Sequence, residues 1–244
     1  MALGLSVFAA CSAPTPQDSA TIAVATNFKT TLEKLQSDFE TRSGYSLNIV
    51  SGSTGKLYAQ IVNGAPYDVF LAADQARPER LVENGQADRA SRFTYARGRL
   101  ALWTPNERIA EAVTFHAPPP ARFAIANPEL APYGRAAIDV IESLEIKSEL
   151  QDRLVFGENV GQAFAFTKTG NTTFGVVAYA QILSLPEHQQ GSFFLPSQDL
   201  YEPIDQDLVL LNRGRDNQAA IAFLTYLKSD DARYIIVQNG FERL

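Results

Sequence analysis

The run SGSTGK, residues 51–56, contains the residue types that bind phosphate groups in many nucleotide-binding loops. A Walker loop needs a glycine five positions before Gly55 and a serine or threonine directly after the lysine. This chain has Val50 and Leu57 at those two positions. The sequence therefore excludes a Walker-type nucleotide site.

A simpler kind of anion binding is still open to this segment. We predict a strand that ends at Ser51 and a helix that starts near Lys56, with Gly52 and Gly55 allowing the backbone to approach a ligand. The free N–H groups at the start of a helix bind anions without help from a lysine. For this loop alone, an ordinary turn made by glycine and serine is the better interpretation.

The same arrangement recurs at three other strand-to-helix junctions. They are VATNF with Thr26 and Asn27, ANPELAPYGRAA with Tyr133, and FGENVGQAF around Val160. In a doubly wound sheet such junctions lie at the carboxyl ends of the strands, where ligands bind. Two junctions belong to each half of the chain, so we expect the four to converge on a cleft.

Alternating strand and helix patterns predict an α/β fold. Apolar strand-like runs stand at 21–25, 46–51, 67–74, 122–126, 153–156 and 207–211, with helical periodicity between them. This alternation indicates parallel, doubly wound sheets flanked by helices. Chain crossings near 99–103 and 201–208 predict two lobes, one formed by 21–99 with 208–244 and the other by 100–207.

Composition and the few chemically reactive residues narrow the function. The 244-residue chain has a net charge of −6 and a pI near 5.0, whereas a face that binds nucleic acid needs a basic excess. His116 and His188 have neither metal-ligand spacing nor a motif nucleophile nearby, and we expect both at the surface. We therefore predict a protein that is not an enzyme and carries no cofactor.

The first 20 residues differ from the rest and resemble an export signal followed by a linker. An apolar run precedes small residues and a proline-rich polar spacer, although no lysine or arginine stands before it. Cys11 follows FAA, which resembles a bacterial lipobox with Phe8 as an unfavourable residue. Two interpretations stay open: a lipid anchor on Cys11, or ordinary cleavage near Ala13 that removes Cys11.

Several blocks together resemble the periplasmic molybdate-binding proteins of ABC importers. The blocks are ATNF, SGSTGKLYAQI, GAPYDVFLAAD, GRLALW, NPELAPYGRAA and GENV, and the resemblance extends from about Thr21 to the C-terminus. It implies a two-lobed type II periplasmic binding protein fold with a two-segment hinge, which closes on a tetrahedral oxyanion.

By motif position, the resemblance implies that Thr26, Asn27, Thr54, Tyr133 and Val160 hold the anion, Val160 through its backbone N–H. Molybdenum would be bound as molybdate through these residues, with no direct bond from protein to metal. Some members supply a tyrosine hydroxyl from a later strand, where this chain has Ala178. We expect Tyr133 to take over that role, and Lys56 and Arg135 to be solvated rather than ligands.

The function implied by the resemblance is capture of molybdate, and of tungstate as well, for a membrane permease. The protein would act outside the cytoplasm as a monomer, tethered through Cys11 if that residue is lipidated. Two alternatives are a receptor for a different anion on the same fold and an effector-sensing domain.

Overall fold

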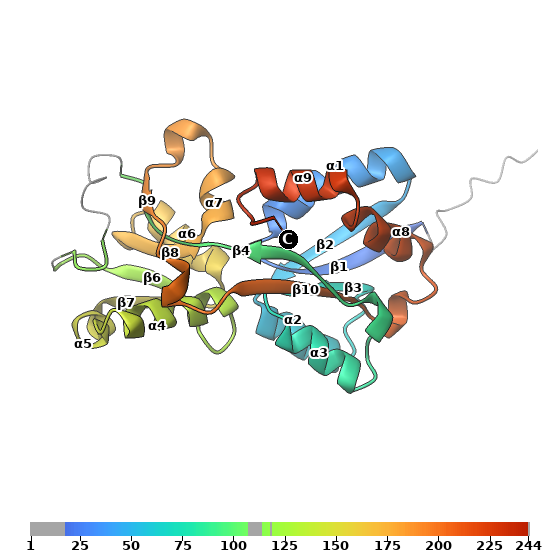
Figure 1. The fold of residues 1–244 in the computed structure, drawn as a ribbon, viewed down its shortest axis with the longest axis horizontal. Helices are drawn as coiled ribbons and strands as arrows, with labels where there is room; N and C mark the ends of the chain where they lie inside the picture. Colours follow the sequence, from blue (N-terminus) through green and yellow to red (C-terminus); the bar gives the residue numbers. More distant parts are fainter. Residues whose placement is uncertain (1–17, 107–113, 118, 244) are drawn as a thin grey trace, which may run out of the picture.

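The computed structural model describes residues 18–106, 114–117 and 119–243, so Cys11 and the predicted export signal lie outside the described residues, apart from 18–20. The chain forms two lobes side by side, joined by strands that run between them (Figure 1). Each lobe is built on a five-stranded sheet. The predicted two-lobed α/β fold is therefore confirmed.

The first lobe combines the N-terminal part of the chain with its C-terminal end. Its sheet has the strand order β2-β1-β3-β10-β4. The strands are β1 (Ser19–Ala25), β2 (Ser46–Gly52), β3 (Val69–Leu71), β4 (Phe93–Gly98) and β10 (Ile204–Leu210). The helices are α1 (Lys29–Ser43), α2 (Thr54–Val62), α3 (Ala76–Glu83), α8 (Gln218–Leu227) and α9 (Asp230–Gln238).

The second lobe is formed by the middle of the chain. Its sheet has the order β7-β6-β8-β5-β9. The strands are β5 (Leu100–Thr104), β6 (Phe123–Ala126), β7 (Leu154–Gly157), β8 (Phe174–Ala178) and β9 (Ser192–Phe194). The helices are α4 (Pro132–Ser143), α5 (Lys147–Leu150), α6 (Val160–Lys168) and α7 (Tyr179–Leu183).

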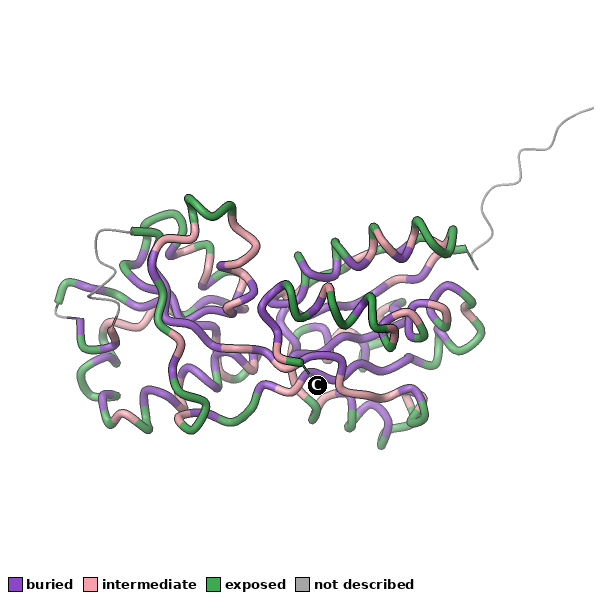
Figure 2. Tube along the Cα trace, turned by 45° about the horizontal axis from the view of Figure 1, so that its top comes forward, coloured by how far each residue is buried: buried purple, intermediate pink, exposed green. Residues whose placement is uncertain are grey.

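Alternating residues of β1 face two different helical layers. Ile22 and Val24 pack in the cluster that contains the buried residues of α1, α8 and α9, whereas Ala23 packs with those of α2 and α3. Successive strand residues point to opposite faces of a sheet, so a buried central strand is apolar on both. Figure 2 shows the result: buried strands in both lobes, with exposed positions on the outer sides of the helices.

Neither sheet is purely parallel, which corrects the predicted parallel arrangement. Strand β10 runs antiparallel to β3 and β4, and β5 runs antiparallel to β8 and β9. Both β5 and β10 come directly from the other lobe. They enter at the edge where the parallel strands end, and must therefore run in the opposite direction.

The two crossings fall close to the predicted places. Only Arg99 separates β4 of the first sheet from β5 of the second. The return crossing lies before Ile204, because β10 pairs from Ile204 onward with β4 in the first sheet. The predicted boundary at 207/208 thus falls inside β10, a few residues late. Within the described residues, no helix is both long and apolar enough to cross a membrane.

Candidate anion-binding site between the lobes

The first predicted junction is a tight turn between β1 and α1. Thr26 N donates to Gly52 O at the end of the neighbouring strand (3.1 Å), which holds this turn beside the second junction. Asn27 is buried, and its Nδ2 donates to Gln206 Oε1 (2.9 Å). The completely buried ring of Phe28 anchors the turn in the core. Asn27 is therefore held in one orientation rather than exposed.

The second junction places a buried hydroxyl at the start of α2. Ser53 caps this helix, and its side chain accepts a hydrogen bond from Lys56 N (3.3 Å). Thr54 is 1% exposed, and its Oγ1 accepts a hydrogen bond from Ala73 N (3.1 Å). A hydroxyl has a single proton and two lone pairs. Because Ala73 occupies a lone pair, the Thr54 proton is available for a different acceptor, such as an anion.

The third junction buries Tyr133 in the first turn of α4, directly after Pro132. Its hydroxyl oxygen accepts a hydrogen bond from Gln206 Nε2 (3.5 Å). Burial is the main cause that raises the pKa of Tyr133 well above its usual range, so the hydroxyl keeps its proton. A Cβ added at Gly134 would lie 2.8 Å from the carbonyl carbon of Ala126, so the glycine lets α4 start against the end of β6.

The fourth junction starts α6 with Val160, which is buried. Asn159 caps the helix, its Oδ1 accepting a hydrogen bond from Gln162 N (3.0 Å). Helix geometry leaves the first N–H groups, including that of Val160, without an acceptor inside α6. A Cβ added at Gly161 would lie 3.3 Å from Thr26 Cβ. The start of α6 in the second lobe therefore lies against the first junction in the first lobe.

The lobes touch one another around these junctions. Besides the contact of Gln206 with Tyr133, polar contacts between them join Gly55 N to Leu130 O (2.9 Å), Lys56 Nζ to Glu158 Oε1 (2.8 Å) and Arg77 to Glu129 O (3.1 Å). Ala25 and Ala73 of the first lobe also belong to the second lobe's apolar cluster. The two lobes therefore contact one another directly beside the junctions.

The two cations beside the junctions are paired with carboxylates. Lys56, with its side chain 54% exposed, contacts Glu158, and Arg135, with its side chain 67% exposed, contacts Asp139 (3.0 Å). The prediction that both are simply solvated is incomplete, because it missed these partners. Their exposure still separates them from the buried hydroxyls of Thr54 and Tyr133.

Three buried or enclosed residues of this region were missed by sequence reasoning. They are Tyr95, Gly98 and Gln206, which lie on the two strands that lead to and from the crossings. Gln206 is completely buried, and the single hydroxyl proton of Tyr95 is shared between Gln206 Oε1 (3.1 Å) and Ala72 O (2.9 Å). In the sequence Gln206 stands between Asp205 and Asp207, just before the predicted strand 207–211, and nothing in this setting indicated that it would be buried.

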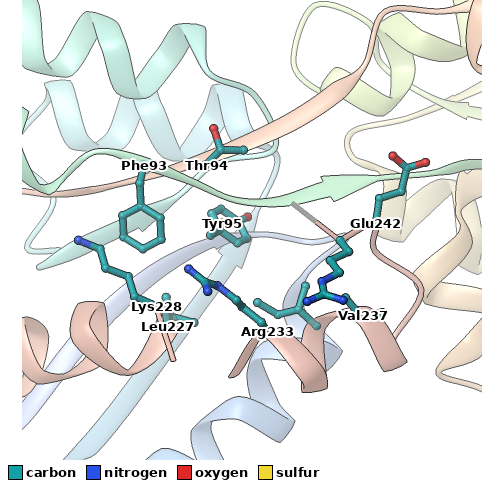
Figure 3. A pocket seen from close by; sticks show the side chains of 10 residues that line it. Phe93, Thr94, Tyr95, Leu227, Lys228, Arg233, Val237 and Glu242 are labelled. Atoms are coloured by element: carbon teal, nitrogen blue, oxygen red, sulfur yellow. The ribbon is translucent and has the colours of Figure 1, made fainter. Parts of the chain in front are cut away.

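Other features of the described residues lie apart from the four junctions. A hollow of about 170 Å³ lies between β4 and the C-terminal helices, where Lys228 Nζ lies 4.7 Å from the centre of the Phe93 ring (Figure 3). It contains no predicted binding residue. Both histidines are exposed, as predicted. In the part of the chain that the structure describes, no cluster of three or more His, Cys, Asp or Glu could hold a metal ion.

Comparison with known proteins agrees with this geometry. Residues 20–242 match the family described as bacterial extracellular solute-binding protein. The chain belongs to this family. It is 40% identical over 220 residues to the molybdate-binding protein ModA of Rhodobacter capsulatus, covering 90% of this chain and 86% of that protein. The ModA of Azotobacter vinelandii is 40% identical over 222 residues, covering 90% and 88%.

A solved structure of a family member shows the same fold. The periplasmic molybdate-binding protein of Azotobacter vinelandii superimposes with a TM-score of 0.87 at 39% sequence identity, covering 91% of this chain and 98% of that one. The similarity therefore covers both lobes and both crossings rather than one lobe alone.

Proposed function

We propose that this family member captures molybdate between its lobes, outside the cytoplasm, and delivers it to the permease of an ABC importer. The observation that carries the proposal is a set of neutral donors at strand-to-helix junctions of both lobes: Thr26, Asn27, Thr54, Tyr133 and the N–H of Val160. Relatives at 40% identity that are named molybdate-binding proteins support it.

The chemistry of the donors suits this anion. Molybdate at neutral pH is a fully deprotonated dianion, so it accepts hydrogen bonds and donates none. The Thr54 hydroxyl already accepts from Ala73 N and has its proton to offer. The starts of helices add partial positive charge. Hydrogen phosphate carries a proton that needs an acceptor, and an unmatched polar group in a closed site costs about 1–3 kcal/mol.

Size provides the remaining selectivity. Sulfate carries the same charge and also donates no hydrogen bond, but its bonds are shorter, so a site fitted to the larger ion leaves its oxygens short of their donors. Tungstate is nearly equal to molybdate in size and charge. We therefore propose tungstate as a second ligand and binding without any catalytic step.

Calorimetric titration of the purified protein with molybdate, tungstate, sulfate and phosphate tests the proposal. We expect molybdate and tungstate to bind with similar affinity, and phosphate to bind at least about tenfold more weakly because of its unmatched proton. Sulfate should also bind more weakly than molybdate. Binding of phosphate or sulfate as tight as that of molybdate would instead identify a receptor for a different anion.

Closure of the lobes is the second part of the proposed mechanism. Because the donors come from both lobes, neither lobe encloses the anion alone. Small-angle scattering should show a monomer that becomes more compact when molybdate is added. Unchanged dimensions at saturating molybdate would contradict closure on the ligand while leaving the binding results intact.

A further inference from the structure

Gln206 lies where β10 enters the first lobe, and its completely buried side chain contacts three different segments. Its Oε1 accepts hydrogen bonds from Asn27 Nδ2 (2.9 Å) and from the Tyr95 hydroxyl (3.1 Å). Its Nε2 donates to the hydroxyl oxygen of Tyr133 (3.5 Å). A single amide on a crossing strand thus joins one binding residue of the first lobe to one of the second.

This contact determines which way the Tyr133 hydroxyl can act. A phenol has one proton to donate and lone pairs that accept. An N–H of Gln206 directed at the oxygen occupies a lone pair, so the Tyr133 proton must point to a different acceptor. Tyr133 is 1% exposed, so bulk water does not offer that acceptor.

The backbone next to this amide has no room for a side chain. Gly98, at the end of β4, pairs with Ile204 at the start of β10. A Cβ added at Gly98 would lie 2.7 Å from Gln206 Nε2 and would also collide with the Tyr133 hydroxyl. Real Cβ atoms do not approach other atoms so closely. The contact between Gln206 and Tyr133 therefore depends on glycine at the first crossing.

We propose that Gln206 is a positioning residue that keeps the Tyr133 hydroxyl as a hydrogen-bond donor towards the bound anion and so disfavours anions that carry a proton. This inference rests on the proposed function. A protonated anion must donate to an acceptor. While the Gln206 amide occupies one lone pair and the Tyr133 proton points at the anion, the Tyr133 oxygen presents no lone pair in that direction. Without the Gln206 amide, the hydroxyl can turn and accept that proton.

The test uses the wild type, Gln206→Met, Tyr133→Phe and the double variant, each titrated with molybdate and with phosphate at pH 8. Both ions then carry two negative charges, so a change in the ratio of their affinities does not reflect charge. Gln190→Met is the matched control, because the Gln190 amide donates to Leu185 O (3.2 Å) in the segment that leads to β9.

We expect Gln206→Met and Tyr133→Phe each to weaken molybdate binding about tenfold, since Tyr133→Phe removes a charge-assisted donor and Gln206→Met removes the contact that directs this donor at the anion. In the Tyr133→Phe background, Gln206→Met should weaken binding by no more than about threefold, the part that acts through Asn27. Gln206→Met should also lower the affinity ratio of molybdate to phosphate, whereas Gln190→Met should leave both affinities unchanged.

Two results would overturn the inference. An equal loss from Gln206→Met in both backgrounds would show that Gln206 does not act through Tyr133. Unchanged molybdate affinity in Tyr133→Phe would show that the Tyr133 hydroxyl donates no hydrogen bond to the anion, as expected if Gln206 Oε1 accepts the Tyr133 proton instead. If Gln206→Met fails to fold, Gln206→Asn, which shortens the side chain by one methylene, replaces it. The Tyr133→Phe result still tests whether the Tyr133 hydroxyl donates to the anion. A wild type that binds no molybdate would instead refute the proposed function, and the inference with it.

Discussion

Replacement of Thr54 by valine separates the two hydrogen bonds of its hydroxyl. Valine has nearly the same shape but neither accepts from Ala73 N (3.1 Å) nor donates to an anion. A hydrogen bond to a charged group contributes about 1.5–3 kcal/mol, so we expect molybdate affinity to fall roughly tenfold to a hundredfold in Thr54→Val. Isothermal titration calorimetry measures this loss directly.

The same substitution should also destabilise the protein without ligand. Ala73 is 2% exposed, so its N–H loses its acceptor in a buried place, which costs about 1–3 kcal/mol. In a protein of this size each kcal/mol lowers the melting temperature by about 2–4 °C. Thr54→Ser keeps the hydroxyl, and should retain most of both the affinity and the stability.

Three controls make the prediction refutable. Thr225→Val makes the same chemical change on α8, where the hydroxyl donates to Ile221 O (3.1 Å), and should leave molybdate affinity unchanged. Lys56→Ala and Arg135→Ala remove exposed ion pairs worth under about 1 kcal/mol and should cost little affinity. If either weakens molybdate binding more than Thr54→Val does, charge pairing holds the anion and the reasoning is wrong.

Three further predictions concern other parts of the chain. Gly98→Ala should weaken molybdate binding at least about tenfold in calorimetry, because overpacking here displaces Gln206 and Tyr133. The variant should still melt cooperatively. Unchanged affinity would show that the two side chains move aside freely. Molybdate affinity should stay constant from pH 6 to pH 9, because burial raises the pKa of Tyr133 and the phenol stays neutral. The folding stability that the buried neutral phenol contributes is complete below the ordinary tyrosine pKa of about 10 and is lost as the pH rises further. If Cys11 is lipidated, the protein from its native host should partition into detergent and Cys11→Ala should release it, whereas a wild type found wholly in the aqueous phase would exclude the anchor.

Local sequence determined most of the secondary structure and the positions of the junctions. The spacing of Leu32, Leu35 and Phe39 predicts one buried face, and all three lie buried on α1. Helix α2 begins at Thr54, slightly before the predicted start near Lys56, because the Ser53 side chain caps it, and Asn159 caps α6 in the same way. Such signals depend on residues within one or two turns of each other, so no knowledge of the distant chain is needed.

Strand direction and the environment of the site were decided only by tertiary structure. Strands β5 and β10 run antiparallel to their neighbours because the chain enters each lobe from the other one. Asn27 and Gln206 are 179 residues apart in sequence, and Lys56 and Glu158 are 102 apart, yet each pair forms a contact. Burial of Gln206 follows from the packing of both lobes around the crossing strands, and no local pattern of residues encodes that packing.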